Sequence, residues 1–229
     1  MLSRRSTLCK GALVAACLQS AFRRALAGGK AAKKTGDRLN TLTVPLHIYV
    51  AQCGPEKLPV RPEAWVKEHV AAAQTVLLPH EVRLSASISA FHPQRCELLG
   101  ALHRDAMAKH VTGDNVVPVL LVQRVRDLDV LDYDLMGVHW RYAGKEAQLI
   151  GRRWIFLTSR AQPPVLAHEL CHFFGLPHDR GGGNLMTPGP SAPASPIMKS
   201  PRPFKPLLTP AQATALRAGI QAWAAANGA

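Results

Sequence analysis

Hydrophobic residues recur with two different periods along this chain, and the period of two marks the expected strands. Residues 42–52 are rich in β-branched and aromatic side chains, and residues 82–89 alternate between apolar and polar positions as a half-buried strand does. Residues 116–125 form a continuous apolar run, which is typical of a central strand. Residues 136–142 are shorter and mixed, which indicates an edge strand, and residues 153–159 predict a further strand.

Apolar residues at three- and four-residue steps mark the expected helices. Residues 62–78 follow this pattern after a proline at the first turn, and residues 96–111 predict a second helix. The last helix begins after Thr209, a suitable N-cap, because Pro210 occupies the first helical position and Gln212 stands three residues beyond the cap.

The order of these elements predicts an α/β (α+β) fold. Strands that alternate with helices indicate a mixed, twisted sheet of about five strands, covered by the helices at 62–78 and 96–111. Residues 187–206 hold seven prolines, which exclude regular secondary structure and predict a long loop. The length of 229 residues suits one domain, which we expect at residues 41–229.

The positive charge of the chain is concentrated at its N-terminus. The formal charge is +13, but residues 1–38 hold nine basic residues against one acidic residue, which leaves only +5 for residues 39–229. No dense basic run with interleaved aromatic residues occurs in that larger part. We therefore expect no nucleic-acid partner.

Residues 1–27 are typical of an export signal, with a basic start, a short apolar run and small residues near the end. Arg4 and Arg5 resemble a twin-arginine signal. An A-x-A sequence offers cleavage after residue 27, whereas a lipobox-like stretch would make Cys17 a lipidated N-terminus. The apolar run is too short to span a membrane. Residues 28–40 then suit a linker or a short pro-segment, and we expect a periplasmic or extracellular protein, either free or lipid-anchored.

The chain has five cysteines, of which three follow the expected signal and linker: Cys53, Cys96 and Cys171. In an exported protein Cys53 and Cys96 can form a disulfide, although Cys53 as a plain buried thiol is an alternative. We expect Cys171 to be a packed thiol rather than a metal ligand.

The stretch "HELCHFFGLPH", residues 168–178, predicts a zinc site. His168 and His172 are four residues apart and would lie on one face of a helix, so that both imidazoles can bind one ion. Glu169 lies beside that face and can act as general base on a zinc-polarised water. Gly175 allows a sharp turn, after which His178 can become the third ligand and leave the fourth position open, as in catalytic zinc sites.

The same stretch matches the extended H-E-x-x-H-x-x-G-x-x-H signature of the metzincin clan of zinc endopeptidases, and "GGGNLMTPG", residues 181–189, is similar to its Met-turn. Met186 follows the third histidine by eight residues, as in matrixins, whereas Asp179 resembles the aspartate of reprolysins. The resemblance implies that Met186 forms an apolar floor below the three imidazoles without binding zinc.

The resemblance also implies an architecture for the whole of residues 41–229. A metzincin-like fold would place an active-site helix after the last strand, followed by a small C-terminal subdomain that holds the Met-turn and the final helix. Residues 136–142 would then be the edge strand on which an extended peptide docks by main-chain pairing.

These patterns together favour an exported, monomeric zinc endopeptidase with a peptide or protein substrate. Glu169 would take a proton from a zinc-bound water and deliver it to the leaving amine. Two alternatives remain open at this point: a binding module that keeps the metal without turnover, and a zinc hydrolase of a non-peptide amide such as a cell-wall crosslink.

Overall fold

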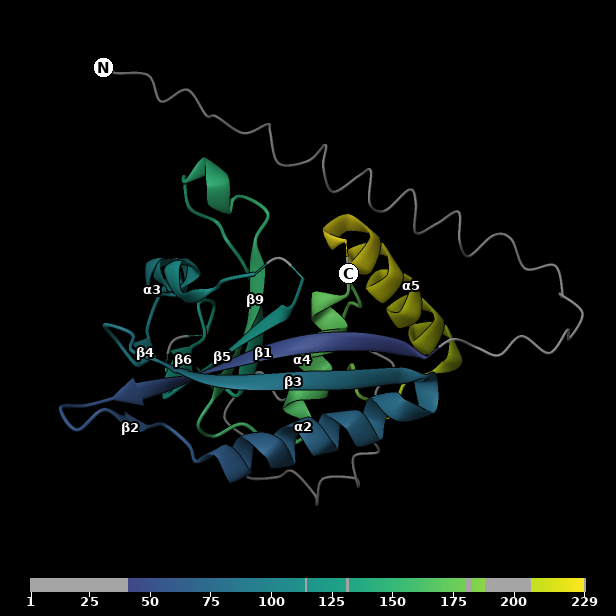
Figure 1. Cartoon of the computed structure of the whole chain (residues 1–229), viewed down its shortest axis with the longest axis horizontal. Helices are drawn as coiled ribbons and strands as arrows, with labels where there is room; N and C mark the ends of the chain where they lie inside the picture. The colour runs from purple at the N-terminus through teal and green to yellow at the C-terminus, as the bar shows by residue number, and fades with distance from the viewer. Residues whose placement is uncertain (1–40, 114, 131, 180–182, 188–206, 229) are drawn as a thin grey trace, which may run out of the picture. The chain divides into compact units, whose positions relative to one another are not determined.

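The computed structural model describes most of the expected catalytic domain (Figure 1). The described residues are 41–113, 115–130, 132–179, 183–187 and 207–228. The expected export signal with Cys17, the linker at 28–40 and nearly all of the proline-rich loop lie outside the described residues.

A six-stranded mixed sheet forms the centre of the described structure, which confirms the predicted fold class. Its order is β2-β1-β5-β9-β8, and β3 also pairs with β1. The strands are β1 (Leu42–Cys53), β2 (Leu58–Pro59), β3 (Val82–Phe91), β5 (Val117–Val122), β8 (Gly137–Arg141) and β9 (Arg153–Thr158). β3, β1, β5 and β9 are parallel, whereas β8 is antiparallel to β9. Among the described strands β8 pairs only with β9, so the expected edge strand is confirmed.

Helices pack on one face of this sheet. They are α2 (Glu63–Leu77), which the 3-10 turn η1 (Leu78–His80) follows, α4 (Val165–Phe173) and α5 (Pro210–Asn227). The 3-10 turn η3 (Ala147–Leu149) packs on the opposite face through Leu149. Buried residues of α2, α4 and α5 share one apolar cluster with alternate residues of the strands, such as Leu46 and Ile48 of β1. Tyr49 of the same strand points to a second cluster on the opposite face, as the period of two requires. The predicted helices at 62–78 and after Thr209 are confirmed.

The predicted helix at residues 96–111 is wrong at residues 96–100. Only α3 (Ala101–Asp105) is α-helical, and η2 (Ala106–His110) continues it as a 3-10 helix on the second face of the sheet. Upstream of them, β4 (Glu97–Leu98) joins a small three-stranded sheet with β6 (Arg124–Arg126) and β7 (Asp134–Leu135). The carbonyl oxygen of Cys96 accepts hydrogen bonds from the amides of Gln123 and Arg124, at 3.0 and 3.3 Å. These distant partners outweigh the local helical preference of the segment.

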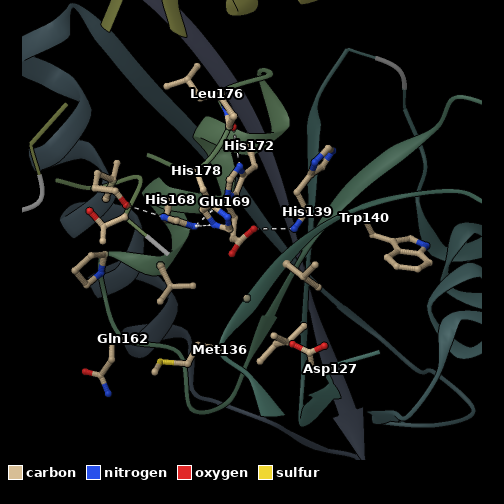
Figure 2. A pocket seen from close by; sticks show the side chains of 18 of the residues that line it. Asp127, Met136, His139, Trp140, Gln162, His168, Glu169, His172, Leu176 and His178 are labelled. Atoms are coloured by element: carbon tan, nitrogen blue, oxygen red, sulfur yellow. Dashed lines mark hydrogen bonds between the residues drawn. The ribbon is translucent and has the colours of Figure 1, made fainter. Parts of the chain in front are cut away.

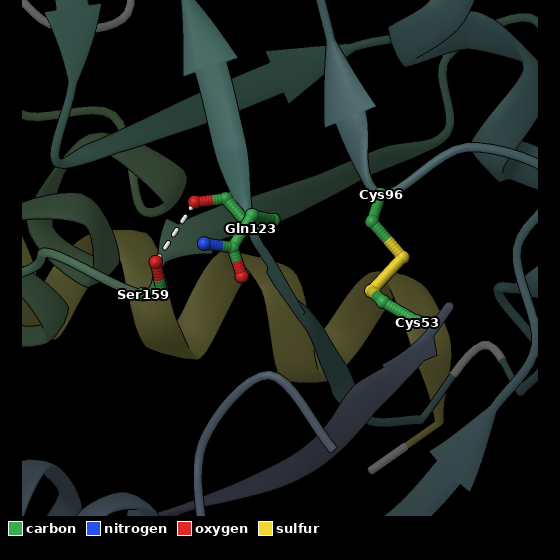
Figure 3. Close-up of a disulfide and its surroundings, with 4 residues drawn as sticks. All are labelled: Cys53, Cys96, Gln123 and Ser159. Atoms are coloured by element: carbon green, nitrogen blue, oxygen red, sulfur yellow. Dashed lines mark hydrogen bonds between the residues drawn. A yellow bond between two sulfur atoms is a disulfide. The ribbon is translucent and has the colours of Figure 1, made fainter. Parts of the chain in front are cut away.

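The predicted strand at 116–125 is interrupted for a related reason. It ends as β5 at Val122, and β6 begins after Gln123 and pairs in the smaller sheet. The carbonyl oxygen of Gln123 accepts a hydrogen bond from the Ser159 hydroxyl at 2.9 Å (Figure 3). The expected pairing of Cys53 with Cys96 is confirmed, since the two form a disulfide that joins the end of β1 to the start of β4 (Figure 3).

Thr209 caps α5 with the reciprocal hydrogen bonds of a capping box: its hydroxyl accepts from the Gln212 amide, and the Gln212 side chain accepts from the Thr209 amide. We expect Thr209→Ala to lower the free energy of unfolding by about 1 kcal/mol, because it leaves a helix-terminal amide without its acceptor. Urea denaturation measures this loss. Thr75→Ala, in an exposed position inside α2, is the matched control; equal losses in the two variants would contradict the capping role.

Candidate functional site

The helix that carries the HELCH motif, α4, is mostly buried and directs two histidines to one side. His168 and His172 lie one turn apart on it. The Nδ1 atom of His168 lies 2.7 Å from the carbonyl oxygen of Leu185, and the Nδ1 atom of His172 lies 2.7 Å from that of Leu176. Because each carbonyl can only accept, both Nδ1 atoms carry the proton, and both Nε2 atoms present a lone pair.

Gly175 ends α4 and turns the chain back toward these rings. Its φ angle is +96°, a conformation that favours glycine. The Gly175 amide bonds to the His172 carbonyl and the Leu176 amide to the Cys171 carbonyl, which together form a Schellman motif. This turn brings His178 to the other two histidines, as its spacing predicts.

The ring nitrogens of the three histidines face one another (Figure 2). The Nε2 atom of His168 lies 3.0 Å from that of His172 and 3.3 Å from that of His178. Candidate ligand atoms of all three lie within 4.8 Å of one another, so the group could hold one metal ion. Burial lowers the pKa of all three imidazoles, that of His172 to about 4. Neutral imidazoles with converging lone pairs fit a zinc ion, since metal binding requires unprotonated ligands.

Glu169 lies beside the three histidines, and its carboxylate reaches toward strand β8 (Figure 2). Glu169 is buried, with only 6% of its surface exposed. Its Oε2 atom accepts a hydrogen bond from the backbone amide of His139 at 2.7 Å. Burial raises the pKa of the carboxyl group to about 8, and this hydrogen bond opposes the shift. A carboxyl group with such a pKa can both take up and release a proton near neutral pH.

The turn that contains Met186 supports His168. Met186 is fully buried, and its carbonyl oxygen accepts from the Asp179 amide at 2.8 Å. Asn184 holds the turn on both sides: its amide group donates to Asp179, and its side-chain oxygen accepts from the Met186 amide at 2.8 Å. The side chain of Gln212 on α5 also donates to Asp179, at 3.2 Å. The turn therefore fixes the Leu185 carbonyl against His168, and the role of Met186 as a floor below the imidazoles stays a prediction.

An open cleft of about 870 Å³ runs over the three histidines and Glu169 and along β8. Figure 2 shows the histidines and Glu169 on one side of β8, and Asp127 and Trp140 on the other. The second wall includes Arg104, a buried cation that lies 4.8 Å from the centre of the Trp140 ring. A cleft open along an edge strand can accept an extended chain.

Two residues of this site were not singled out by the sequence: Gly137 and His139 of β8. His139 has no spacing that relates it to the metal motif, and only the folded strand brings its amide to Glu169. A glycine inside an expected strand is a known signal for close approach of another group, and Gly137 fits that signal. Cys171 is a free, buried thiol, as expected, and burial raises its pKa.

The described residues show a likeness to solved metallopeptidase structures, although no protein-family model and no curated protein matches the chain. Mirolysin in complex with compound 9 superimposes with a TM-score of 0.54 at 10% identity, over 80% of this chain and 96% of the other. A Tannerella forsythia promirolysin mutant superimposes with a TM-score of 0.50 at 7% identity, over 74% of this chain. This chain spans 65% of the promirolysin chain. Both are metzincin-clan metallopeptidases, and at these identities the likeness shows a shared fold.

Proposed function

We propose that this chain is an exported, zinc-dependent endopeptidase. The observation that carries the proposal is the convergence of three histidine Nε2 atoms in an open cleft, with the buried carboxyl group of Glu169 beside them. The three histidines account for three ligands of a tetrahedral ion, and an open fourth position is typical of catalytic rather than structural zinc. His168, His172 and His178 would hold the ion.

Bound zinc would supply Lewis-acid activation of a water molecule and of the carbonyl group to be cleaved. Glu169 acts as the general base and then as the general acid. The His139 amide holds its Oε2 atom, which leaves Oε1 to accept the proton of the water. Its raised pKa favours this uptake of the proton, and the same carboxyl group then returns the proton to the leaving amine.

The substrate is an extended peptide that lies along β8, between α4 and the opposite wall of the cleft. An edge strand offers unpaired backbone groups, which bind any extended peptide through main-chain hydrogen bonds. We expect the enzyme to act as a monomer, because one chain holds the three ligands, the general base and the edge strand.

Export is supported by the Cys53–Cys96 disulfide, since such bonds persist mainly in oxidising compartments. Within the described part of the chain, no helix is long and apolar enough to cross a membrane. The signal at residues 1–27 and an anchor at Cys17 belong to this proposal.

The proposal is tested with protein that begins at Gly28. We expect one zinc per chain and cleavage of a mixed peptide library that stops when a chelator removes the ion and returns when zinc is added back. Ions are measured by atomic absorption and products by mass spectrometry. One zinc without any peptide cleavage would instead favour the metal-containing binding module or a hydrolase of cell-wall amides. No zinc at all would refute the metal site.

A further inference from the structure

Strand β8 lies against Glu169 at two positions, Gly137 and His139. At both positions Glu169 meets the backbone of the strand and not one of its side chains. The His139 amide donates to the Glu169 carboxylate, and a Cβ atom at Gly137 would lie 2.9 Å from the Glu169 Cγ atom. We propose that β8 is the positioning element of the general base: the His139 amide orients the carboxylate, and Gly137 leaves the space that it occupies. The inference rests on the proposed function.

The pairing of β8 with β9 shows that the His139 amide points outward. Met136 pairs with Thr158 and Tyr142 pairs with Arg152 through backbone hydrogen bonds, at 3.0 Å each. Hydrogen-bonded positions alternate along an antiparallel pair. Because positions 136 and 142 are bonded to β9, the backbone groups of positions 137, 139 and 141 face the free edge of the sheet.

The amide at position 139 is therefore not one of the groups that hold the sheet together. Its partner is Glu169 Oε2, and this is the one hydrogen bond to the Glu169 carboxylate that the described residues show. A buried carboxylate with one directional donor has one preferred orientation. The amide of His139 is therefore engaged with the general base. The outward-facing backbone groups of positions 137 and 141 are left for main-chain hydrogen bonds to a peptide.

Gly137 explains how Glu169 can approach the strand so closely. A Cβ atom at this position would lie 2.6 Å from Val165 Cγ1, 2.9 Å from Glu169 Cγ and 3.1 Å from Glu169 Oε1. Real Cβ atoms essentially never come as close as the first two of these distances, so any side chain at position 137 would displace α4 or the Glu169 side chain. The general base needs a backbone without a side chain at this point of β8.

The first test separates the amide of His139 from its imidazole. His139→Pro removes both, whereas His139→Ala removes only the imidazole; proline is tolerated on an edge strand where the amide faces outward. We expect kcat of the proline variant to be on the order of 10- to 100-fold below that of the alanine variant, with equal KM and one zinc in each, because a misplaced base slows the reaction. Equal kcat values, or a rise in KM alone, would overturn the proposal.

The second test adds a methyl group at the point of contact. We expect Gly137→Ala to lower kcat on the order of 10-fold or more with zinc retained, and the additional change Val165→Ala to restore part of it by removing the closest contact. Gly100→Ala is the matched control, because a Cβ atom there meets nothing within 4 Å. Full activity of Gly137→Ala would contradict the close approach.

The third test is independent of activity, so it can fail separately from the proposed function. In hydrogen exchange followed by NMR, we expect the His139 amide of the peptide-free protein to be protected although it faces the free edge. Glu169→Ala should speed its exchange at least about 10-fold, while the Trp140 amide, bonded to β9, stays protected. Exchange of the His139 amide as fast as that of Arg141 in the unchanged protein would overturn the inference, whether or not peptides are cleaved.

Discussion

Replacement of Glu169 by glutamine is expected to lower kcat on the order of 10²- to 10⁴-fold, which is the range that general acid–base catalysis contributes. The amide is nearly the same shape as the carboxylate and can still accept the hydrogen bond from the His139 amide. It cannot take up the proton of a water molecule. The loss should therefore appear in kcat, with little change in KM, because the cleft keeps its form.

The measurement is steady-state cleavage of one peptide selected from the library, together with the zinc content of each variant. Glu169 is not a predicted ligand, so one zinc per chain should remain. Glu68→Gln makes the same chemical change at an exposed position of α2 and serves as the control. A Glu169→Gln protein that keeps its zinc and most of its kcat would show that another group is the base.

Loss of the Cys53–Cys96 disulfide is expected to cause the largest change in stability. The bridge joins residues 43 positions apart in the sequence. A loop of that size restricts the unfolded chain enough to contribute roughly 4 kcal/mol in the chain-entropy model. In a domain of this size, the melting temperature should fall on the order of 10 °C.

The test variant carries both Cys53→Ser and Cys96→Ser, and its melting temperature is measured by calorimetry. Cys171→Ser serves as the control. Cys171 is free and buried, so its change alters packing without opening a covalent loop. Because Cys53 and Cys96 pack against the apolar cluster on the face of the sheet opposite α4, we expect the zinc content to stay at one ion. Equal melting temperatures in the unchanged and double-serine proteins would contradict the stabilising role.

The expected elements were most reliable where local chemistry alone decides the structure. The capping box of Thr209 and Gln212 set the start of α5, since a cap needs only residues of its own helix. The amphipathic period of residues 62–78 likewise matched α2. The prediction failed at residues 96–100, at the start of the expected helix, where a disulfide and hydrogen bonds from Gln123 and Arg124 hold Cys96 in an extended segment.

The sequence by itself determined the candidate metal group, which consists of His168, His172 and His178. Helical geometry places the first two on one face, and a single turn at Gly175 brings the third to them. The sequence could not determine what orients Glu169. That role depends on the pairing of β8 with β9, which decides that the His139 amide faces outward and that Gly137 lies against α4. Register and packing between distant segments arise only when the sheet forms, so only the tertiary structure decided them.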